Sequence, residues 1–536
     1  MRWCAVTRNN SKCNRNDDDD GQKDRNDDRK GYVYDEEDRG GTDYEDNVKH
    51  RVILCQCEPR KCHRRCCRRR RRRLLEYGSA HDEILILGIT MIRMSRKRKQ
   101  NVPSSSLEER SNSIGLTTHR ELLPPPPHQL SPVALISKMN SMVYTLYGFA
   151  VFFMIFWSGM WIVHALALIT GRWKLHRKVP QVPSYETPLP GVSIIKPLMG
   201  VDPNLFSNLE TFFTMEYPRY ELLFCVEDDS DPVLMLVGKL IEKYPQIETR
   251  VFVGGRNVGV NPKINNMQPA YEAAKYELVL ISDSGIRMKE DTLLDMVNYM
   301  TDKVALVHQM PFTCDRDGFA AAYEKIFFGT VQSRMYLAAD LLRINCHTGM
   351  SALLRKATLD EVGGLKTFGV YLAEDFFYAK SLTDRGWRMT VCSQPALQNS
   401  GHCELHSFQA RLRRWAKLRV AMLPTMIVME PLSECLVLGA CASWAASVLF
   451  EWDSLVFYLV HVLLWFMFDW TLLCVVQNGP LPFNKFMFVC GWLISEITRP
   501  YLFVQAVLDP LIQWRSRVYK LRWGGVAEEV KTKVKY

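Results

Sequence analysis

The sequence predicts an α/β domain built on a mostly parallel sheet and flanked by transmembrane α-helices. Between about residues 190 and 400, short β-rich runs alternate with polar or helix-like stretches, a pattern typical of βαβ units. Long apolar segments stand on both sides of this region, and acidic residues directly follow two of the predicted strands. Because ligands collect at the carboxyl ends of strands in such sheets, the acids indicate a binding site there.

Six apolar runs supply the predicted strands. In chain order they are GVSIIKPL, YELLFCVED, TRVFVGG, YELVLISDSG, VALVHQM and GMSALLRK. Asp228 follows the second run and Asp283 follows the fourth. Taken alone, each acid is equally well explained as a loop or helix cap, since aspartate is common in both places.

One apolar segment precedes the sheet region. Residues 144 to 170 are uncharged, and the segment exceeds the roughly 20 residues that cross a bilayer. It is too long and too far from the chain start for a cleaved signal peptide, so we expect a retained anchor. Arg172 and Lys174 follow it, whereas Lys138 is the only basic residue close upstream. The positive-inside rule therefore predicts that residues 171–430 face the cytosol.

Composition narrows the partners. The chain has 536 residues, a formal net charge of +10 and 16 cysteines. Positive charge suits a membrane surface or nucleic acid as a partner. Because apolar segments stand beside the basic clusters, we expect the partner to be the membrane and not nucleic acid. The cysteines lack the framework of a disulfide-rich secreted chain, so we expect them to be reduced. The oligomeric state is not predicted.

Residues 1–140 have a biased composition. They contain acidic, arginine-rich and proline-rich runs and few apolar residues to close a core, so we expect a disordered extension. The cysteines between Cys55 and Cys67, with His63, do not form two separated ligand pairs. A zinc site is therefore the weaker interpretation of that tract.

Three apolar segments follow residue 430, at about 432–450, 455–476 and 486–508. The third contains Glu496 and Arg499, which are costly in lipid unless they pair or face a cavity. Three full crossings would place the basic tail, residues 510–536, in the lumen. Two crossings with a re-entrant third segment would keep that tail in the cytosol.

Four features follow one another in the predicted cytosolic domain: Asp228 in EDDSD, Asp283 in DSG, Asp375 in LAEDFF, and the motif Arg411-x-x-Arg414-Trp415. A nucleotide-sugar donor brings a diphosphate. Its site needs a carboxylate to hold a divalent cation and arginines to take up the charge of the leaving diphosphate. Asp283 suits the first role, and the two arginines suit the second.

The acceptor hydroxyl needs a base. Asp375 lies between two apolar stretches, where partial burial would raise its basicity, so it is the candidate general base. Trp415 is suited to stacking on a sugar, a base or a guanidinium. A basic amphipathic helix on the membrane face is an alternative for residues 411–419, and both roles can hold at once. In this order, the four features predict a glycosyltransferase with a GT-A-type, nucleotide-sugar-binding domain.

Several stretches resemble the ceramide glucosyltransferases. They are GVSIIKPLMGVDPNLFSNLETFF, NPKINN at 261–266, YELVLISDSGIRM, AEDFF and RLRRW, and the likeness runs from about the first membrane helix to the C-terminus. NPKINN is the most distinctive stretch, because general sugar synthases share the acids but not this hexapeptide. Processive synthases usually have glutamine where this chain has Arg411.

The resemblance implies an inverting transfer of glucose from UDP-glucose to the primary hydroxyl of ceramide, on the cytosolic face of the Golgi membrane. It implies that Asp228 binds the nucleotide, that Asp283 binds the diphosphate and a divalent cation (Mg²⁺ or Mn²⁺), and that Asp375 is the base. Arg411, Arg414 and Trp415 would form the product-side motif. Lys263, within NPKINN, and His308 would belong to the donor site.

Two other functions are compatible with parts of the sequence. A processive polysaccharide synthase of the hyaluronan, chitin or cellulose type would need more membrane helices to build a channel. A non-catalytic membrane scaffold that binds nucleotide would leave Asp375 without a use.

Overall fold

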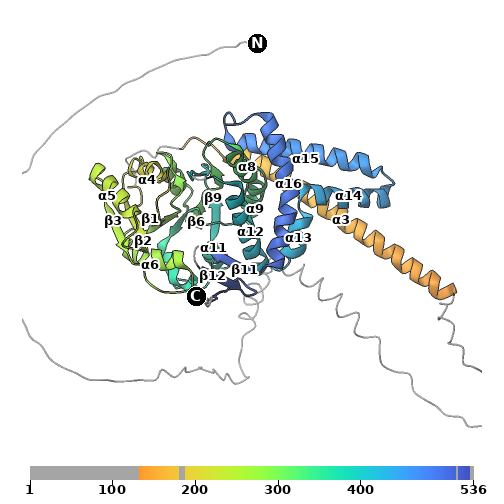
Figure 1. The fold of residues 1–536 in the computed structure, drawn as a ribbon, viewed down its shortest axis with the longest axis horizontal. Coiled ribbons are helices and arrows are strands. Elements are labelled where there is room, and N and C mark those ends of the chain that lie inside the picture. The colour runs from red at the N-terminus through yellow and green to blue at the C-terminus, as the bar shows by residue number, and fades with distance from the viewer. Residues whose placement is uncertain (1–131, 180–187, 402, 515–516, 531–536) are drawn as a thin grey trace, which may run out of the picture. The chain divides into compact units, whose positions relative to one another are not determined.

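The computed structural model describes residues 132–179, 188–401, 403–514 and 517–530. Within these residues, a sheet domain carries three long helices, α3, α14 and α15, which project from one side of it (Figure 1). The zinc-site interpretation and most of the expected disordered extension lie outside the described residues.

The central sheet has seven strands in the order β3-β2-β1-β4-β8-β6-β9. β1 pairs in parallel with β2 and β4, β2 with β3, and β6 with β9, whereas β8 runs antiparallel to both of its neighbours. The mostly parallel α/β fold is therefore confirmed, and all six predicted runs form strands; β9 is the one strand of this sheet that was not predicted. The bounds are Val192–Leu198 (β1), Tyr220–Val226 (β2), Thr249–Val253 (β3), Leu278–Ser282 (β4), Val304–His308 (β6), Ser351–Arg355 (β8) and Arg388–Val391 (β9).

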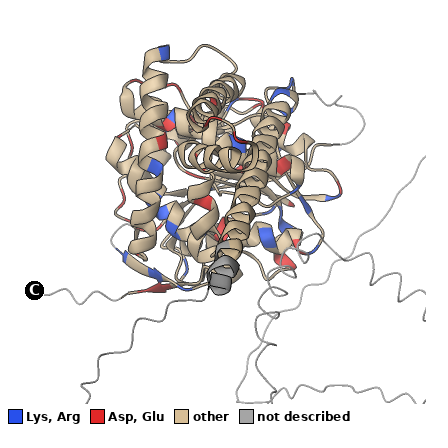
Figure 2. Cartoon of the chain, turned by 90° about the vertical axis from the view of Figure 1, so that its right-hand side faces the viewer, with Lys and Arg blue, Asp and Glu red and all other residues tan. Residues whose placement is uncertain are grey.

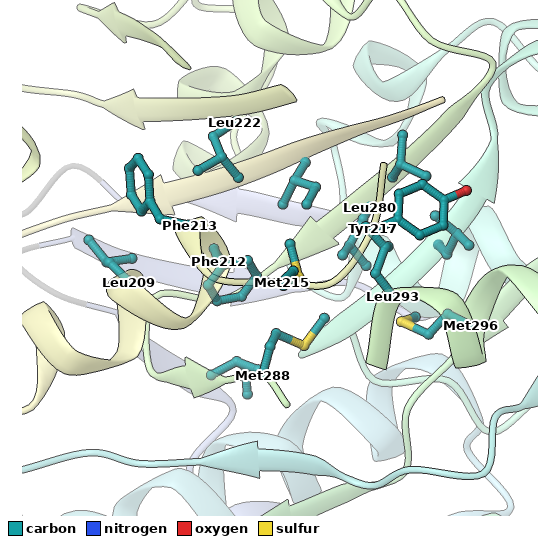
Figure 3. Close-up of a cluster of buried hydrophobic side chains, with 14 of the residues drawn as sticks. Leu209, Phe212, Phe213, Met215, Tyr217, Leu222, Leu280, Met288, Leu293 and Met296 are labelled. Atoms are coloured by element: carbon teal, nitrogen blue, oxygen red, sulfur yellow. The ribbon is translucent and has the colours of Figure 1, made fainter. Parts of the chain in front are cut away.

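Both faces of this sheet are buried. Alternate residues of β1 and β2 face opposite ways: Ile194 and Phe224 join one apolar cluster, and Ile195 and Cys225 join another. Figure 3 shows the first cluster, where Phe212 packs beneath the strands. Burial on both faces explains why these strands read as nearly continuous apolar runs. The covering helices are Leu205–Phe213 (α4), Val233–Lys243 (α5), Pro262–Ala273 (α6), Thr292–Asn298 (α7), Lys356–Asp360 (α10) and Glu374–Thr383 (α11).

A second group of elements links the sheet to the projecting helices. A small sheet, in the order β5-β10-β7, lies beside the main one. Two of its strands, β7 and β10, are followed in the chain by helices whose apolar side chains share one cluster with the projecting helices. The bounds are Ile286–Arg287 (β5), Pro311–Thr313 (β7), Ala396–Gln398 (β10), Phe319–Phe327 (α8), Phe328–Gln332 (π-helical η1), Ser333–Leu342 (α9) and Leu405–Met422 (α12). The short helix Leu365–Phe368 (η2) packs instead in a cluster on the main sheet.

Two of the described helices are long and apolar enough to cross a membrane, namely α3 (Pro132–Lys174) and α15 (Ser454–Gln477). A third span is possible if α13 (Met426–Leu432) and α14 (Cys435–Phe450), which meet at a bend of 85°, count as one. The predicted anchor, residues 144–170, lies within α3. That helix already begins at Pro132, because the residues before 144 contain no glycine or internal proline to stop it. Figure 2 views this side, and the projecting helices are almost without charged residues along their length.

The third apolar segment after residue 430 differs from the first two in its orientation. α16 (Lys485–Leu508) runs crosswise to α14 and α15 (Figure 1) and is not among the helices suited to crossing a membrane. Its buried face carries Glu496 and Arg499, and Arg499 pairs with Glu434 at 2.6 Å. Apart from Lys485 at its start, its exposed positions are all apolar or aromatic: Phe486, Val489, Leu493, Ile497, Tyr501, Val504, Val507 and Leu508.

The chain after α16 folds back onto the sheet domain. Strands β11 (Leu511–Trp514), β12 (Arg517–Leu521) and β13 (Ala527–Glu529) form an antiparallel sheet where only a basic tail was expected. The Ala527 N–H donates to the Val370 carbonyl at 3.0 Å, and Val526 forms a bridge with Tyr371. The C-terminal sheet therefore packs against the sheet domain. Two crossings with a re-entrant third segment, which would keep this part of the chain in the cytosol, stay a prediction.

Candidate active site

Three of the predicted residues meet at the carboxyl edge of the central sheet. Asp283 comes directly after β4, Lys263 lies in the first turn of α6, and Asp375 lies in the first turn of α11. The Lys263 ammonium is 2.9 Å from the Asp283 carboxylate and 3.3 Å from the carboxylate of Glu374, the neighbour of Asp375. One lysine therefore sits among three acids.

The NPKINN stretch has a structural explanation for each polar residue. Asn261 caps α6 by accepting from the Lys263 N–H at 2.8 Å, and its amide donates to Glu374 at 2.8 Å. Asn265 accepts from the Val258 N–H, and Asn266 donates to the Cys225 carbonyl at the end of β2. The hexapeptide thus fixes the start of the helix that presents Lys263.

Lys263 keeps its charge in this setting. Burial opposes ionisation of the ammonium, but Asp283 and Glu374 outweigh it and raise the pKa of Lys263 above its usual range. The lysine therefore neutralises part of the negative charge at the sheet edge.

Asp375 is partly buried and has the character of a base. Burial and the neighbouring Glu374 raise the pKa of Asp375 to about 7, and Lys263 opposes this rise. Its carboxylate accepts from the backbone N–H of Gly349 and, at 2.9 Å, from that of Phe376. A carboxyl group with a pKa near neutrality is well matched to accepting a proton from a hydroxyl group.

A strap, residues 345–350, leads from α9 into β8 and was missed by the sequence analysis. Its backbone touches three charged residues of the site: the Gly349 N–H reaches Asp375, the Gly349 carbonyl is 3.4 Å from the Lys263 ammonium, and the Met350 carbonyl accepts from the Asp283 N–H at 2.9 Å. A Cβ on Gly349 would lie 2.9 Å from that of Asp375, so glycine permits the close approach. Backbone contacts of this kind leave little trace in a sequence beyond the glycine.

Lys196 was also missed. It lies inside β1, donates to the Asp283 carbonyl at 2.7 Å and sits 3.8 Å from the centre of the Phe212 ring. Burial lowers the pKa of Lys196 to about 7. A lysine in the middle of an otherwise apolar strand, GVSIIKPL, is the signal that could have revealed it.

Asp228 lies at the end of β2, apart from this cluster. Its carboxylate accepts from the backbone N–H of Ser230 at 2.9 Å and from the hydroxyl of the same residue at 2.7 Å. These hydrogen bonds lower the pKa of Asp228. Since β1 lies between β2 and β4, Asp228 and Asp283 share one edge of the sheet, but the hydrogen bonds of Asp228 are those of a turn cap.

His308, at the end of β6, is buried behind the strap. Its ring lies 4.9 Å from that of His347 and 5.5 Å from that of Tyr336, measured between centres. Burial lowers the pKa of His308 to about 4, so the imidazole is neutral near pH 7. The structure thus places it next to the strap and not beside the three acids.

The arginine motif lies on α12. Arg411 pairs with the buried Glu324 of α8 and lies over the rings of Phe408 and Trp415, at 5.1 and 5.7 Å. Trp415 packs edge-on against Phe328 at 6.2 Å. Arg411 is thus held by Glu324 and lies against two aromatic rings, and Trp415 packs on Phe328. Both motif residues therefore have partners among the helices that link the sheet to the projecting helices.

Arg414 differs from Arg411. Its guanidinium lies 5.9 Å from the ring of Trp514 in β11. Burial and the nearby Arg411 lower the pKa of Arg414. Within the described part of the chain, no carboxylate pairs with it, so this cation is available for an anionic ligand.

A divalent cation would need carboxylate ligands at this edge of the sheet. In the described ranges, no three or more His, Cys, Asp or Glu side chains cluster to hold a metal by themselves. Mg²⁺ usually needs only one or two protein carboxylates when substrate phosphates and water complete its shell. Asp283, whose side chain is 41% exposed and has one oxygen on Lys263, fits a cation that arrives with a diphosphate.

One edge of a mostly parallel sheet thus brings together Asp283, which suits a cation with a diphosphate, and Asp375, which suits a general base. The class of protein with this arrangement is the glycosyltransferases with a GT-A-type fold, here joined to helices suited to a membrane.

The chain belongs to glycosyl transferase family 21, whose model matches residues 159–527. It is 45% identical over 402 residues to ceramide glucosyltransferase 1 of Caenorhabditis elegans, covering 74% of this chain and 85% of the relative. It is 42% identical over 409 residues to ceramide glucosyltransferase 3 of the same organism, covering 76% and 88%. The ceramide glucosyltransferase of Komagataella phaffii is 26% identical over 449 residues, covering 68% and 87%.

Among solved structures, the chain is similar to a mannosyltransferase from Pyrobaculum calidifontis in complex with GDP-mannose and Mn²⁺. The two share 17% identity and a TM-score of 0.38, over 68% of this chain and 98% of the other.

Proposed function

We propose that this protein transfers glucose from UDP-glucose to the primary hydroxyl of ceramide, with inversion, and so makes glucosylceramide. The observation that carries the proposal is Asp375, a partly buried carboxylate with a pKa raised to about 7. It lies beside Lys263 and Asp283 in a chain whose relatives at 45% and 42% identity are named ceramide glucosyltransferases.

Each residue has a role that its surroundings support. Asp283 would hold the divalent cation, Mg²⁺ or Mn²⁺, which neutralises the diphosphate when bound. Lys263 would shift its ammonium toward the incoming phosphates. Arg414, which has no carboxylate partner among the described residues, would take up charge on the departing UDP. Asp228, Arg411, Trp415 and His308 remain proposed members of the donor and product side.

The acceptor reaction uses Asp375. Its carboxylate would accept the proton of the ceramide hydroxyl as that oxygen attacks the anomeric carbon and the bond to UDP breaks. Attack from the face opposite the leaving UDP gives inversion. The base ends protonated, and its proton then passes to solvent.

Membrane placement supports a lipid acceptor. The exposed face of α16 is apolar beyond its first residue, and the helix runs crosswise to α14 and α15. The sheet domain would therefore lie directly at the membrane surface. We propose a multi-pass protein of the Golgi membrane whose sheet domain faces the cytosol.

The direct test uses membranes that contain the wild-type chain or Asp375→Asn, incubated with labelled UDP-glucose and a short-chain ceramide. We expect glucosylceramide from the wild type and a loss of about 100-fold or more in Asp375→Asn, because a general base contributes on that order. Asp384→Asn, an exposed acid on the end of the same helix that pairs with Lys380, is the matched control and should keep the wild-type rate.

Three outcomes would contradict the proposal. Equal product from wild type and Asp375→Asn would reject the base. A labelled polymer in place of a glycolipid would favour a polysaccharide synthase, and no product from the wild type would favour a nucleotide-binding scaffold.

A further inference from the structure

The strap, residues 345–350, is tied to α11 at two points. The Asn345 amide donates to the Phe376 carbonyl at 3.1 Å, and the His347 Nε2 lies 3.0 Å from the Tyr378 hydroxyl. Phe376 and Tyr378 come one and three residues after Asp375 on that helix. The strap and the base are therefore held to each other by contacts outside the reacting groups.

The contact between His347 and Tyr378 is deeply buried. The two residues are 3% and 1% exposed. Burial lowers the pKa of the His347 imidazole and raises that of the Tyr378 hydroxyl, so both are neutral near pH 7. Neither group has solvent as an alternative partner, so the hydrogen bond between them is expected to persist.

We propose that His347 and Tyr378 are positioning residues whose hydrogen bond clamps the strap to α11 and so keeps the Gly349 N–H on the Asp375 carboxylate. This inference rests on the proposed role of Asp375 as the base. Gly349 has no side chain with which to hold its own place, so the neighbouring side chains of the strap must do so.

The clamp has a chemical consequence. A backbone N–H that donates to a carboxylate favours its ionised form, so a loosened strap would leave Asp375 protonated at higher pH. The other titratable groups near this carboxylate, Glu374, Lys263, Asp283 and Tyr336, are unaltered by the substitutions below. So are His308, which lies against His347, and Cys346, which lies near Tyr336.

The experiment measures glucosyl transfer to a short-chain ceramide between pH 5.5 and 9, with membranes containing Tyr378→Phe or His347→Leu. We expect the acid limb of the rate profile to move up by about 0.5 pH unit or more, with roughly threefold or greater loss of rate at pH 6 and little loss at pH 9. The KM for UDP-glucose should stay within about twofold of wild type, because the clamp is not on the donor.

Two further comparisons separate positioning from general instability. The double variant should show no further shift, because either substitution alone breaks the same bond. His347→Gln, whose amide nitrogen falls near the position of Nε2, should keep the wild-type limb, whereas His347→Asn should not. Rates are corrected for protein level and for thermal stability in detergent.

Tyr271→Phe is the matched control. Its hydroxyl, on a side chain that is 3% exposed, donates to Asp360 at 2.6 Å, remote from the strap. This variant should lose stability while its acid limb stays in place.

An unmoved acid limb in Tyr378→Phe and His347→Leu would overturn the inference. Equal profiles for His347→Gln and His347→Asn would also overturn it. These two variants retain a polar side chain, so they keep the test usable if the larger changes prevent folding. Failure of the proposed function shows itself differently, because the wild type would then make no glucosylceramide or Asp375→Asn would match it.

Discussion

Asp375 owes its basicity to burial first and to the neighbouring Glu374 second, because both disfavour a negative charge on its carboxyl group. Lys263 opposes them by attracting that charge. The balance leaves the carboxyl with a pKa of about 7 instead of its usual value near 3.8. The same lysine holds Asp283, so one side chain couples the donor and acceptor halves of the site.

The wild-type enzyme should lose activity as the pH falls through 7. The base must be ionised, and a carboxyl with a pKa raised to about 7 takes up its proton about three pH units higher than an ordinary aspartate. The measurement is the initial rate of glucosyl transfer at saturating donor between pH 5 and 9. A rate that stays constant down to pH 5 would show that the folded enzyme does not raise this pKa.

Removal of the lysine charge should harm both halves of the site. Lys263→Gln leaves Glu374 and Asp283 without their shared cation, at a cost to stability of roughly 3 kcal/mol. It should raise the KM for UDP-glucose and move the acid limb to higher pH. Lys263→Arg keeps the charge and should be milder on both counts. Steady-state kinetics at several pH values check this, and identical behaviour of the two variants would contradict it.

At the scale of elements, α16 combines an ion pair with an apolar surface. Arg499 contacts Glu496 one turn before it and Glu434 at the start of α14. The opposite face, with Ile497 and Tyr501, is exposed and suited to lipid. Charged residues that look costly for a membrane segment are thus satisfied by packing against a neighbouring helix.

Loss of the arginine should destabilise this layer. Arg499→Leu leaves two buried carboxylates without their cation, which costs about 3–5 kcal/mol. The expected result is a lower thermal midpoint of the detergent-extracted protein and less protein in membranes. Ile497→Ala, two residues away on the exposed face, is the control and should change the midpoint little. Equal midpoints for the two variants would mean that the ion pairs do not hold α16.

At the scale of the whole described molecule, the C-terminal sheet joins parts of the chain that are far apart in sequence. Gly525, between β12 and β13, packs against Phe377 of α11 and Met422 of α12. The Gly524 N–H donates to the Ala421 carbonyl at 2.9 Å. This sheet therefore connects the helix of the base to the helix of the arginine motif.

A pair of adjacent glycines tests that connection. Both have positive φ, 82° at Gly525 and 90° at Gly524, but a Cβ on Gly525 would lie 2.8 Å from the Phe377 ring, whereas one on Gly524 meets nothing within 4 Å. Each alanine variant should lose about 1 kcal/mol of stability from backbone strain. Only Gly525→Ala should also lower the transfer rate, by disturbing α11. Equal rates in the two variants, measured at equal protein level, would contradict the connection.

The fold was largely predictable because buried parallel strands have a strong local signature. β1, β2 and β4 are nearly continuous apolar runs, and acids follow β2 and β4. β9 and the C-terminal strands were not predicted, since RMTV and RVYKL are short and mixed in character, and their pairing depends on distant partners. Within the site, Asp283 and Asp375 could be predicted from their order in the sequence. The strap could not, because it acts through backbone groups that every residue has.

Hydropathy and periodicity alone determine the α/β class, the anchor before it and the acids at the strand ends, because each of these depends on residues close together in the chain. Only the tertiary structure decides that Lys263 joins Asp283 to Glu374, that Arg411 is held by Glu324 and that the C-terminal strands return to the sheet domain. These contacts link segments tens to hundreds of residues apart. Their energies depend on burial and distance, which no local pattern encodes.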